Sequence, residues 1–388
     1  MHHRLRSVLT LTLLGGVLAA PLPTQAQTGS ATVVLAPVSE RQLTEPGLVS
    51  REQSARFSSG TLPYSISYRV RIDKNRDSIV PSEGYIGMPQ PTSCNWYGGG
   101  FLTVTLNGQD IGMTPVSSVL VAQTGSRAIL DLVWHHTIAT VRVRFVGLPG
   151  RDGLYCEISL DPKQEIKSLA VGLRCYPSFF TSWYKRDGAR RIQTPTATIR
   201  QGEQAKLPAR DHWWALYSDD VFDVAKGEGE GPCAMMYLPG QPSEVTYAPG
   251  SYAVDTTLVY PPSTRQLRLA FWDLKGVTNA EALARMQAGA ETTRQELEQA
   301  DFTPEAVRSF DVAALQAEVD RALASPEIRN SLGGRLSEVE AWVTRYGPGL
   351  RQHDANPGLE AEETLLQSLQ TYQSFIWEVR LAELISEL

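Results

Sequence analysis

Residues 64–72 read YSISYRVRI, and this stretch decides the fold class. Its apolar side chains occupy every second position from Tyr64 to Ile72, and serines and arginines fill the positions between them. Successive side chains of a β-strand point to opposite faces, so a period of two predicts a half-buried strand. One face of this strand should lie in a core and the other should meet water.

The same alternation recurs along most of the chain. Leu102, Val104 and Leu106 repeat it, and Asn107-Gly108 then supplies the residues of a tight type I′ hairpin turn. Many antiparallel strands must bury their apolar faces on one another, so residues 27–277 are predicted to form a large antiparallel β-sandwich domain, or a barrel. Further strands are expected at residues 117–122, 127–136, 141–145, 154–160, 166–176, 196–200, 232–238, 251–260 and 265–272.

The hydrophobic period changes from two to 3.6 between Asp273 and Thr278, which predicts an α-helical domain over residues 278–388. Thr278 and Glu281 match a capping box, in which each side chain can satisfy a free backbone amide. Later helices should begin where a capping residue precedes a proline, because the first helical position needs no N–H. These starts are Thr303-Pro304, Ser325-Pro326 and Asn356-Pro357.

Two glycine motifs should interrupt these helices. Gly333-Gly334 is expected to break the third helix, and Gly347-Pro348-Gly349 is expected to end it. The last helix carries an apolar stripe at alternating spacings of four and three. This stripe predicts packing on the neighbouring helices or on the sandwich, with a short coiled-coil seam as the alternative. Its residues are Leu365, Leu369, Tyr372, Ile376 and Val379.

The charge of the chain argues against nucleic acid as a partner. The formal net charge is −6, and the helical region from Thr278 onward holds 19 acidic and 9 basic residues. A protein that binds nucleic acid needs a basic stripe or patch, and the sequence shows none. The acidic helical region is instead a candidate surface for a protein partner.

The first residues have the pattern of a secretory signal peptide. Arg4 and Arg6 give a positive start, residues 9–20 are an apolar core, and Thr24-Gln25-Ala26 is a small-residue cleavage site. The apolar run is too short to span a membrane. The chain is therefore predicted to be exported, either secreted or periplasmic, with residues 1–26 removed.

Four cysteines would then enter a compartment that permits disulfides. They are Cys94, Cys156, Cys175 and Cys233, and four cysteines allow three different pairings. Cys156 and Cys175 fall on the apolar faces of expected strands, where free buried cysteine is common. The sequence leaves open both the pairing and whether a disulfide forms.

The densest polar and aromatic cluster lies at residues 211–223. Trp213 and Trp214 could stack on the apolar face of a sugar ring, and nearby carboxylates could hydrogen-bond its hydroxyls or act as acid and base. The alternative is that the tryptophans belong to the core and the acidic group to a solvated turn. Weak catalytic candidates here are His212, Asp219, Asp220 and Asp223.

A second histidine is a further weak catalytic candidate. His135 shares a strand face with Asp131, which could orient it as a base, whereas His136 points to the opposite, apolar face. Asp73, Asn75 and Asp77 begin like a Ca²⁺ loop, but the later positions of the pattern fail. No metal site and no cofactor are predicted.

Two other segments could contact a ligand. Trp96 and Tyr97 lead into Gly98-Gly99-Gly100, a loop that could form a binding lip or merely connect two strands. The segment from residue 174 to 186 interleaves aromatic rings with cations, which suits an anionic saccharide, although packed aromatics at a sheet rim explain the same pattern. Its candidate residues are Arg174, Tyr176, Trp183 and Lys185.

The strand run from about residue 62 to 272, with its aromatic and charged face, resembles the galactose-mutarotase-like supersandwich. That fold recurs in sugar epimerases and as a module of glycosidases and polysaccharide lyases. The resemblance implies an open concave sheet on which carbohydrate binds. The epimerase motif of Asn-His followed by Phe-Asn is absent, so no catalytic residue is carried over.

Three functions are consistent with these observations. The first is a noncatalytic carbohydrate-interacting protein outside the cytoplasm. The second is a carbohydrate-active enzyme, a lyase, epimerase or hydrolase, that uses the 211–223 cluster. The third is a structural or assembly protein that binds a partner through residues 278–388.

The leader gives the first testable prediction. Signal peptidase should cleave after Ala26, because small residues precede that bond. N-terminal sequencing of the exported protein should therefore begin at Gln27, and a membrane-associated product that retains Met1 would contradict export.

Overall fold

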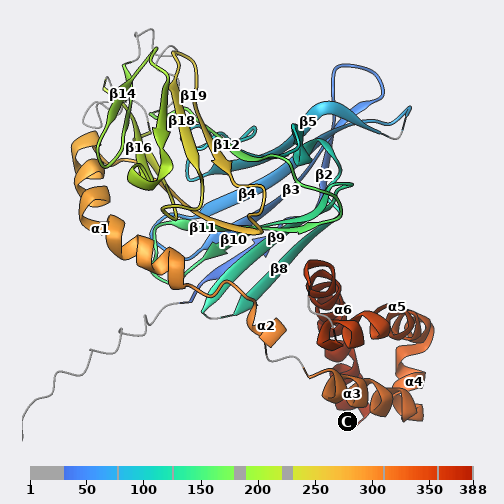
Figure 1. The fold of residues 1–388 in the computed structure, drawn as a ribbon. Coiled ribbons are helices and arrows are strands. Elements are labelled where there is room, and N and C mark those ends of the chain that lie inside the picture. Colours follow the sequence, from blue (N-terminus) through green and yellow to red (C-terminus); the bar gives the residue numbers. More distant parts are fainter. Residues whose placement is uncertain are drawn as a thin grey trace, which may run out of the picture.

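The computed structural model describes residues 30–76, 78–124, 126–178, 189–220, 230–308, 311–355 and 358–386. The predicted signal peptide, residues 1–26, therefore lies outside the described residues. In the described part, two antiparallel sheets pack face to face, and helices follow them in the chain (Figure 1). The predicted β-sandwich with C-terminal helices is thus confirmed.

The larger sheet has 11 strands in the described chain, and its main path runs β1-β3-β4-β5-β6-β12-β19-β18-β15. The expected turn at Asn107-Gly108 joins β6 to β7, and both residues have positive φ, as a type I′ turn requires. The strands are β1 Thr32–Leu35, β2 Ser39–Gln42, β3 Leu48–Ser58, β4 Tyr64–Asp73, β5 Ser78–Gln90, β6 Leu102–Leu106, β7 Gln109–Asp110, β12 Leu169–Cys175, β15 Ala205–Pro208, β18 Glu244–Pro249 and β19 Val254–Tyr260.

The second sheet has nine strands in the described chain, in the order β14-β13-β16-β17-β20-β11-β10-β9-β8. Its inner face meets the inner face of the first sheet in one continuous apolar core, which includes Trp134, Phe145 and Phe271. The strands are β8 Ser118–Thr124, β9 Arg127–His135, β10 Ala139–Gly147, β11 Leu154–Pro162, β13 Arg190–Gln193, β14 Thr198–Arg200, β16 Trp214–Asp219, β17 Cys233–Tyr237 and β20 Gln266–Asp273.

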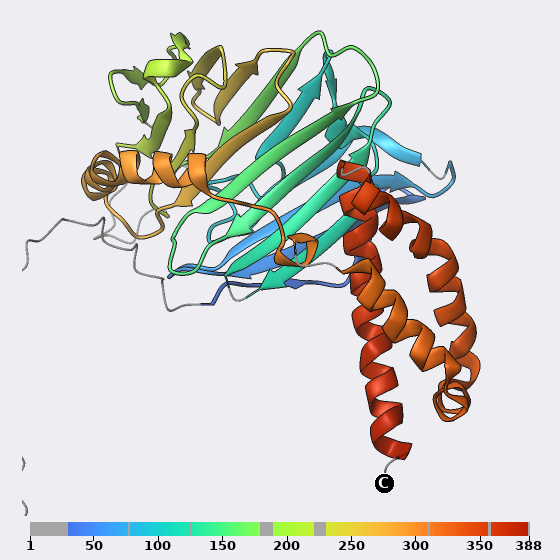
Figure 2. The ribbon, with the colours of Figure 1, turned by 60° about the horizontal axis from the view of Figure 1, so that its bottom comes forward.

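Two helices lie against parts of the outer face of the nine-stranded sheet, α1 on β16, β17 and β20 and α6 on β8, β10 and β11 (Figures 1 and 2). Helix α1 begins after Thr278, whose side chain accepts a hydrogen bond from the Glu281 amide, and it buries Met286, Ala290 and Leu297 against this sheet. The helices are α1 Asn279–Gln299, α2 Glu305–Arg308, α3 Val312–Ala324, α4 Pro326–Leu332, α5 Leu336–Ala355 and α6 Leu359–Ser386.

Two expectations for the helices have different outcomes. Helix α4 does end before Gly333, but α5 runs through Pro348 to Ala355, so the predicted stop at residues 347–349 is wrong. Helix propensity is a weak preference that tertiary packing often overrides. Here α5 packs along α6, and the ring of Trp342 stacks on Tyr372. No helix among the described residues is long and apolar enough to cross a membrane.

Buried charges attach α6 to the nine-stranded sheet. Glu362 of α6 accepts from Arg144 and Arg142 of β10 at 2.7 and 2.6 Å. Arg144 is fully buried and also forms a two-point pair with Asp131 of β9 at 2.7 and 2.6 Å. Burial opposes ionisation of Glu362, yet the two guanidinium groups hold its pKa below the usual value.

Replacing Glu362 with Ala should destabilise the protein, because it leaves two buried arginines with fewer acceptors. We expect a loss of about 2 kcal/mol or more in the free energy of unfolding, measured with urea. Glu360→Ala is the matched control in the same helical turn. Its carboxylate is 54% exposed, so the loss should stay within about 1 kcal/mol. Equal losses in the two variants would contradict this role for Glu362.

Candidate functional site

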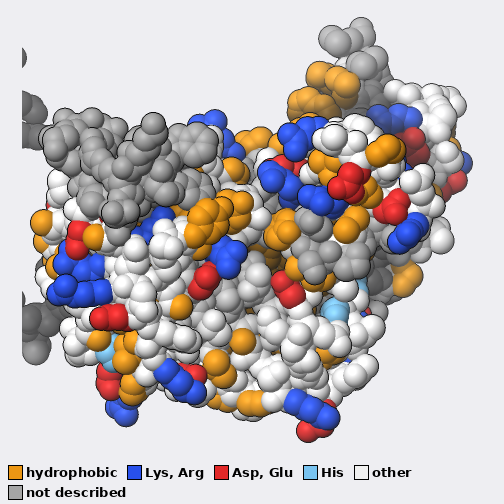
Figure 3. Space-filling view, turned by 90° about the horizontal axis from the view of Figure 1, so that it is seen from above, with side chains coloured by type: hydrophobic (Ala, Val, Ile, Leu, Met, Phe, Trp, Pro, Cys, Tyr) orange, Lys and Arg blue, Asp and Glu red, His pale blue; other side chains and the backbone are white. Residues whose placement is uncertain are grey.

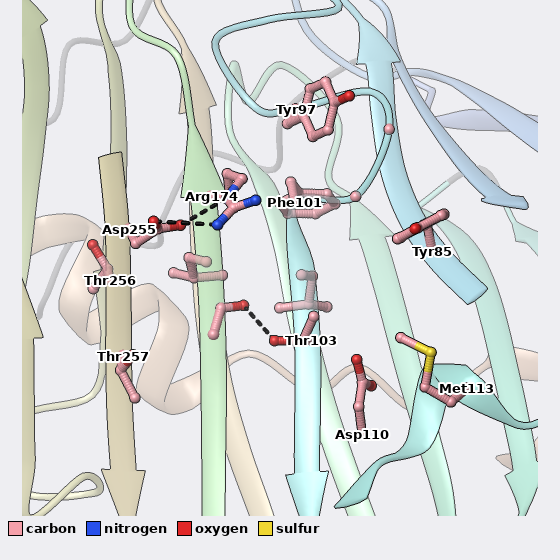
Figure 4. Close-up of a pocket in the computed structure, with 15 residues that line it drawn as sticks. Tyr85, Tyr97, Phe101, Thr103, Asp110, Met113, Arg174, Asp255, Thr256 and Thr257 are labelled. Atoms are coloured by element: carbon pink, nitrogen blue, oxygen red, sulfur yellow. Dashed lines mark hydrogen bonds and ion pairs between the residues drawn. The ribbon is translucent and has the colours of Figure 1, made fainter. Parts of the chain in front are cut away.

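A cavity of about 350 Å³ lies on the outer face of the 11-stranded sheet, over β6, β12 and β19. Its floor is a row of three residues in register, Thr103, Gly172 and Thr257. Gly172 contributes no side chain, and a Cβ there would lie 2.4 Å from the Thr103 hydroxyl. The glycine therefore keeps the centre of the floor open (Figure 4).

An ion pair stands at one end of this floor. Arg174 of β12 donates to Asp255 of β19 through Nε at 2.7 Å and through Nη2 at 3.3 Å. The hydrogen bond that Arg174 donates to Asp255 raises the pKa of the Arg174 guanidinium. The side chains of Arg174 and Asp255 are both about half exposed. The pair thus presents a planar donor beside a planar acceptor to whatever enters the cavity.

Aromatic rings form one wall of the cavity. Tyr97 comes from the loop between β5 and β6, and Tyr85 comes from β5 itself (Figure 4). Tyr97 packs edge-on against Tyr176 with the ring centres 4.9 Å apart. At Gly100, φ is +141° and an added Cβ would lie 3.0 Å from the Tyr85 ring, so only glycine fits there without strain.

A second carboxylate lies toward the other end, near Met113. Asp110 accepts a hydrogen bond from the Gly112 amide at 2.9 Å and so caps a short 3₁₀ turn, Ile111–Met113. Burial raises the pKa of Asp110. The cavity therefore combines apolar rings, two carboxylates, one guanidinium and several hydroxyl groups.

The loop that carries Tyr97 is anchored in the opposite sheet. Asp273 of β20 accepts hydrogen bonds from the Thr92 amide and hydroxyl at 3.2 and 2.7 Å and from the Asn95 amide group at 3.0 Å. Trp96 is fully buried and donates from its indole to the Trp272 carbonyl at 3.0 Å. Burial raises the pKa of Asp273 to about 6.

Of the predicted ligand residues, Tyr97 and Arg174 line the cavity. Tyr176 lies buried beside it, in contact with Tyr97. Trp96 is a core residue, so its prediction as an exposed ring in the lip is wrong. Consecutive side chains of an extended segment point in opposite directions. In this segment the Trp96 ring points into the core and the Tyr97 ring points to the cavity. Trp183 and Lys185 lie outside the described residues.

Among the described residues of the cluster, 211–220, the candidate side chains do not share one concave surface. Trp214 is buried on β16 against α1, and Trp213 is half-buried against the core, so the structure agrees with the alternative that the tryptophans belong to the core. Asp219 is fully buried and accepts from the Ala189 amide at 3.2 Å, whereas Asp220 pairs with Arg191. Asp223 lies outside the described residues.

Neither catalytic histidine candidate occupies the setting expected of it. His212 is buried with Nδ1 2.8 Å from the Thr194 hydroxyl, and burial lowers its pKa. His135 lies between Glu360 and Glu363 of α6, at 3.3 and 2.8 Å. Asp131 pairs with Arg144 instead of orienting His135, so that expectation is wrong. In the described part of the chain, no three His, Cys, Asp or Glu residues converge as metal ligands.

Sequence reasoning missed Tyr85, Thr103, Asp110, Gly172 and Asp255. Only Gly172 carried a usable signal, because a glycine inside a strand often marks a close approach of a ligand or of backbone. On a face of the molecule seen in Figure 3, acidic side chains lie near basic ones, with hydrophobic groups exposed between them.

No family model and no curated protein matches this sequence. Solved structures do match in fold. A provisionally assigned aldose 1-epimerase from Klebsiella pneumoniae has a TM-score of 0.36 and 10% identity, over 70% of this chain and 97% of that one.

Two further matches extend this comparison. An α-N-acetylgalactosaminidase from Bifidobacterium bifidum has a TM-score of 0.38 and 10% identity, over 73% of this chain and 42% of that one. A TPR-domain protein from Parabacteroides distasonis has a TM-score of 0.35 and 10% identity, over 92% of this chain and 79% of that one. Such low scores transfer neither a ligand nor a reaction to this chain.

The raised pKa of Asp273 predicts a pH-dependent stability. A carboxyl group whose pKa rises from 3.8 to about 6 on folding stabilises the fold most at low pH, and that contribution is lost as the pH rises through about 6. Relative to Asp273→Asn, the natural protein should therefore lose a few kcal/mol between pH 4.5 and 7.5. Urea unfolding of both proteins at the two pH values measures this, and parallel changes would contradict it.

Proposed function

We propose that this chain is an exported, noncatalytic carbohydrate-interacting protein that holds a saccharide in the cavity over β6, β12 and β19. The observation that carries the proposal is the pairing of an aromatic wall with a polar end around an open floor. Tyr97 supplies a ring, Arg174 and Asp255 supply the planar polar groups, and Gly172 supplies the space.

Sugar chemistry matches this arrangement. A pyranose ring has an apolar C–H face that packs on aromatic rings and a rim of hydroxyl groups that need both donors and acceptors. The Arg174–Asp255 pair offers both to neighbouring hydroxyls, and charge-assisted hydrogen bonds are the stronger kind. A volume of about 350 Å³ is at the lower end of the range for small-molecule sites, which favours one or two sugar units.

Both carboxylates of the cavity already accept hydrogen bonds from within the protein, which supports a noncatalytic role. Asp255 is committed to its ion pair with Arg174, and Asp110 is committed to the cap of the 3₁₀ turn. The enzyme alternative relied on the 211–223 cluster. That alternative loses support, because His212 and Asp219 are buried and each is bonded to groups of its own sheet or loop.

A role in assembly has one specific observation in its favour. Trp377, Leu381 and Leu384 of α6 are 71%, 47% and 57% exposed. Their spacings of four and three residues place them on one face of the helix, as in a seam that receives a second helix. This surface is independent of the cavity, so a protein partner on α6 would be compatible with saccharide binding.

Replacing Arg174 with Ala tests the cavity. We expect the affinity for a saccharide identified on a glycan array to fall about tenfold or more, because a charge-assisted donor is lost and Asp255 keeps no cation beside it. Isothermal titration gives the two affinities.

Arg191→Ala is the matched control. Arg191 also forms a cross-strand pair with an aspartate, Asp220, but it lies on the other sheet and outside the cavity. Both variants should unfold within about 1 kcal/mol of the natural protein, since each loses one exposed ion pair. Unchanged binding by Arg174→Ala, or an equal loss in both variants, would count against the proposed site.

A further inference from the structure

Two of the four cysteines lie where the ends of the two sheets meet. Cys175 is the last residue of β12 in the 11-stranded sheet, and Cys233 is the first residue of β17 in the nine-stranded sheet. Both are fully buried in the common core. All four cysteines are free thiols in this structure.

A group at the end of each of these two strands donates a hydrogen bond to the same backbone carbonyl. The Asn95 carbonyl accepts from the Tyr176 amide at 3.3 Å and from the Cys233 thiol at 3.4 Å. A few residues away, the Ser178 amide donates to the Gly231 carbonyl at 2.9 Å. The segments that contain Cys175 and Cys233 are therefore held side by side.

The same short segment contacts both cysteines. The Cys233 thiol donates to the Asn95 carbonyl, and the next residue, Trp96, forms a β-bridge with Cys175. Burial raises the pKa of the Cys233 thiol well above its usual value, and the nearby Cys175 thiol adds to the rise. Arg190 and Tyr217 each lie near both sulfur atoms. The geometry thus favours a single link between Cys175 and Cys233 over any link that involves Cys94 or Cys156.

The remaining two cysteines have other neighbours. Cys156 lies within β11, opposite Phe145 of β10 and Leu269 of β20. Cys94 lies in the loop before β6, packed with Tyr176 and Ala253, and its thiol is 3.6 Å from the Ser93 hydroxyl. These placements leave both cysteines outside the pair.

We propose that Cys175 and Cys233 form a disulfide between the two sheets when the folding chain meets an exchangeable disulfide, such as oxidised glutathione or a disulfide-donating protein. One thiolate attacks the donor disulfide and releases a thiol, and the second thiolate then attacks the mixed disulfide. The two cysteines lose two electrons and two protons, and the donor is reduced to two thiols. Because both sulfur atoms are buried, the exchange takes place before the core closes.

This disulfide would brace the wall of the cavity. Arg174 precedes Cys175 on β12, and its carbonyl accepts from the Tyr97 amide at 3.3 Å. Trp96, directly before Tyr97, forms a β-bridge with Cys175. A covalent link at Cys175 therefore fixes the strand end from which both the ion pair and the loop are positioned.

The test is a disulfide map of the natural chain. The reduced, unfolded protein is refolded with reduced and oxidised glutathione, its free thiols are blocked with N-ethylmaleimide in denaturant, and tryptic peptides are analysed by mass spectrometry. The expected result is one linked pair, Cys175 with Cys233, and maleimide on Cys94 and Cys156. Maleimide on all four cysteines, or any other linked pair, would overturn the proposal.

Two comparisons complete the experiment. Cys156→Ala should still form the link, whereas Cys175→Ala should leave Cys233 labelled. The oxidised natural protein should melt several degrees above the reduced one, because the cross-link restricts the unfolded chain. Equal melting temperatures would overturn the bracing role. None of these readouts involves a saccharide, so they succeed or fail independently of the proposed ligand.

Discussion

The cavity depends on one buried carboxylate. Asp273 is almost wholly inaccessible, and its carboxylate accepts hydrogen bonds from neutral groups of Thr92 and Asn95. Its own backbone amide donates to the Tyr64 hydroxyl at 2.9 Å. One residue of the nine-stranded sheet thereby fixes both a strand of the opposite sheet and the loop that presents Tyr97. The hydrogen bonds that shape the site offset only part of the cost of burying this charge, because the pKa of Asp273 stays raised.

The two outer faces of the sandwich serve different purposes. The face of the nine-stranded sheet carries arginines on β10 that would be costly to bury alone, and carboxylates from β9 and α6 neutralise them. Parts of that face are covered by α1 and α6 (Figure 2). The face of the 11-stranded sheet carries small and hydroxyl-bearing side chains at its centre, and it keeps a cavity open to solvent. The asymmetry explains why the proposed ligand site and the helical attachment do not compete.

The sequence predicted a strand well where its alternation is clear, because alternation reports burial directly. The expected strand at 127–136 differs from β9 by one residue at one end, and the one at 265–272 differs from β20 by one residue at each end. The long strands β3 and β5 were not predicted, because charged residues, glycine and proline interrupt their alternation. The site was harder to predict, because it is made by pairing distant segments. Arg174 and Asp255 face each other only because β12 pairs with β19, and no local pattern reveals that partner. For Trp96-Tyr97 and Trp213-Trp214, the sequence could not tell which aromatic ring of an adjacent pair points into the core.

The central claim is that the open floor at Gly172 receives a saccharide. The most direct measurement is a glycan array probed in parallel with the natural protein and with Gly172→Val, which fills the floor beside Thr103 but leaves the ion pair and the rings in place. The account predicts that the natural protein binds a defined set of glycans and that the variant binds none of them, while its circular dichroism spectrum and cooperative melting show that it still folds. Identical binding by both proteins, or no glycan bound by the natural protein, would contradict it.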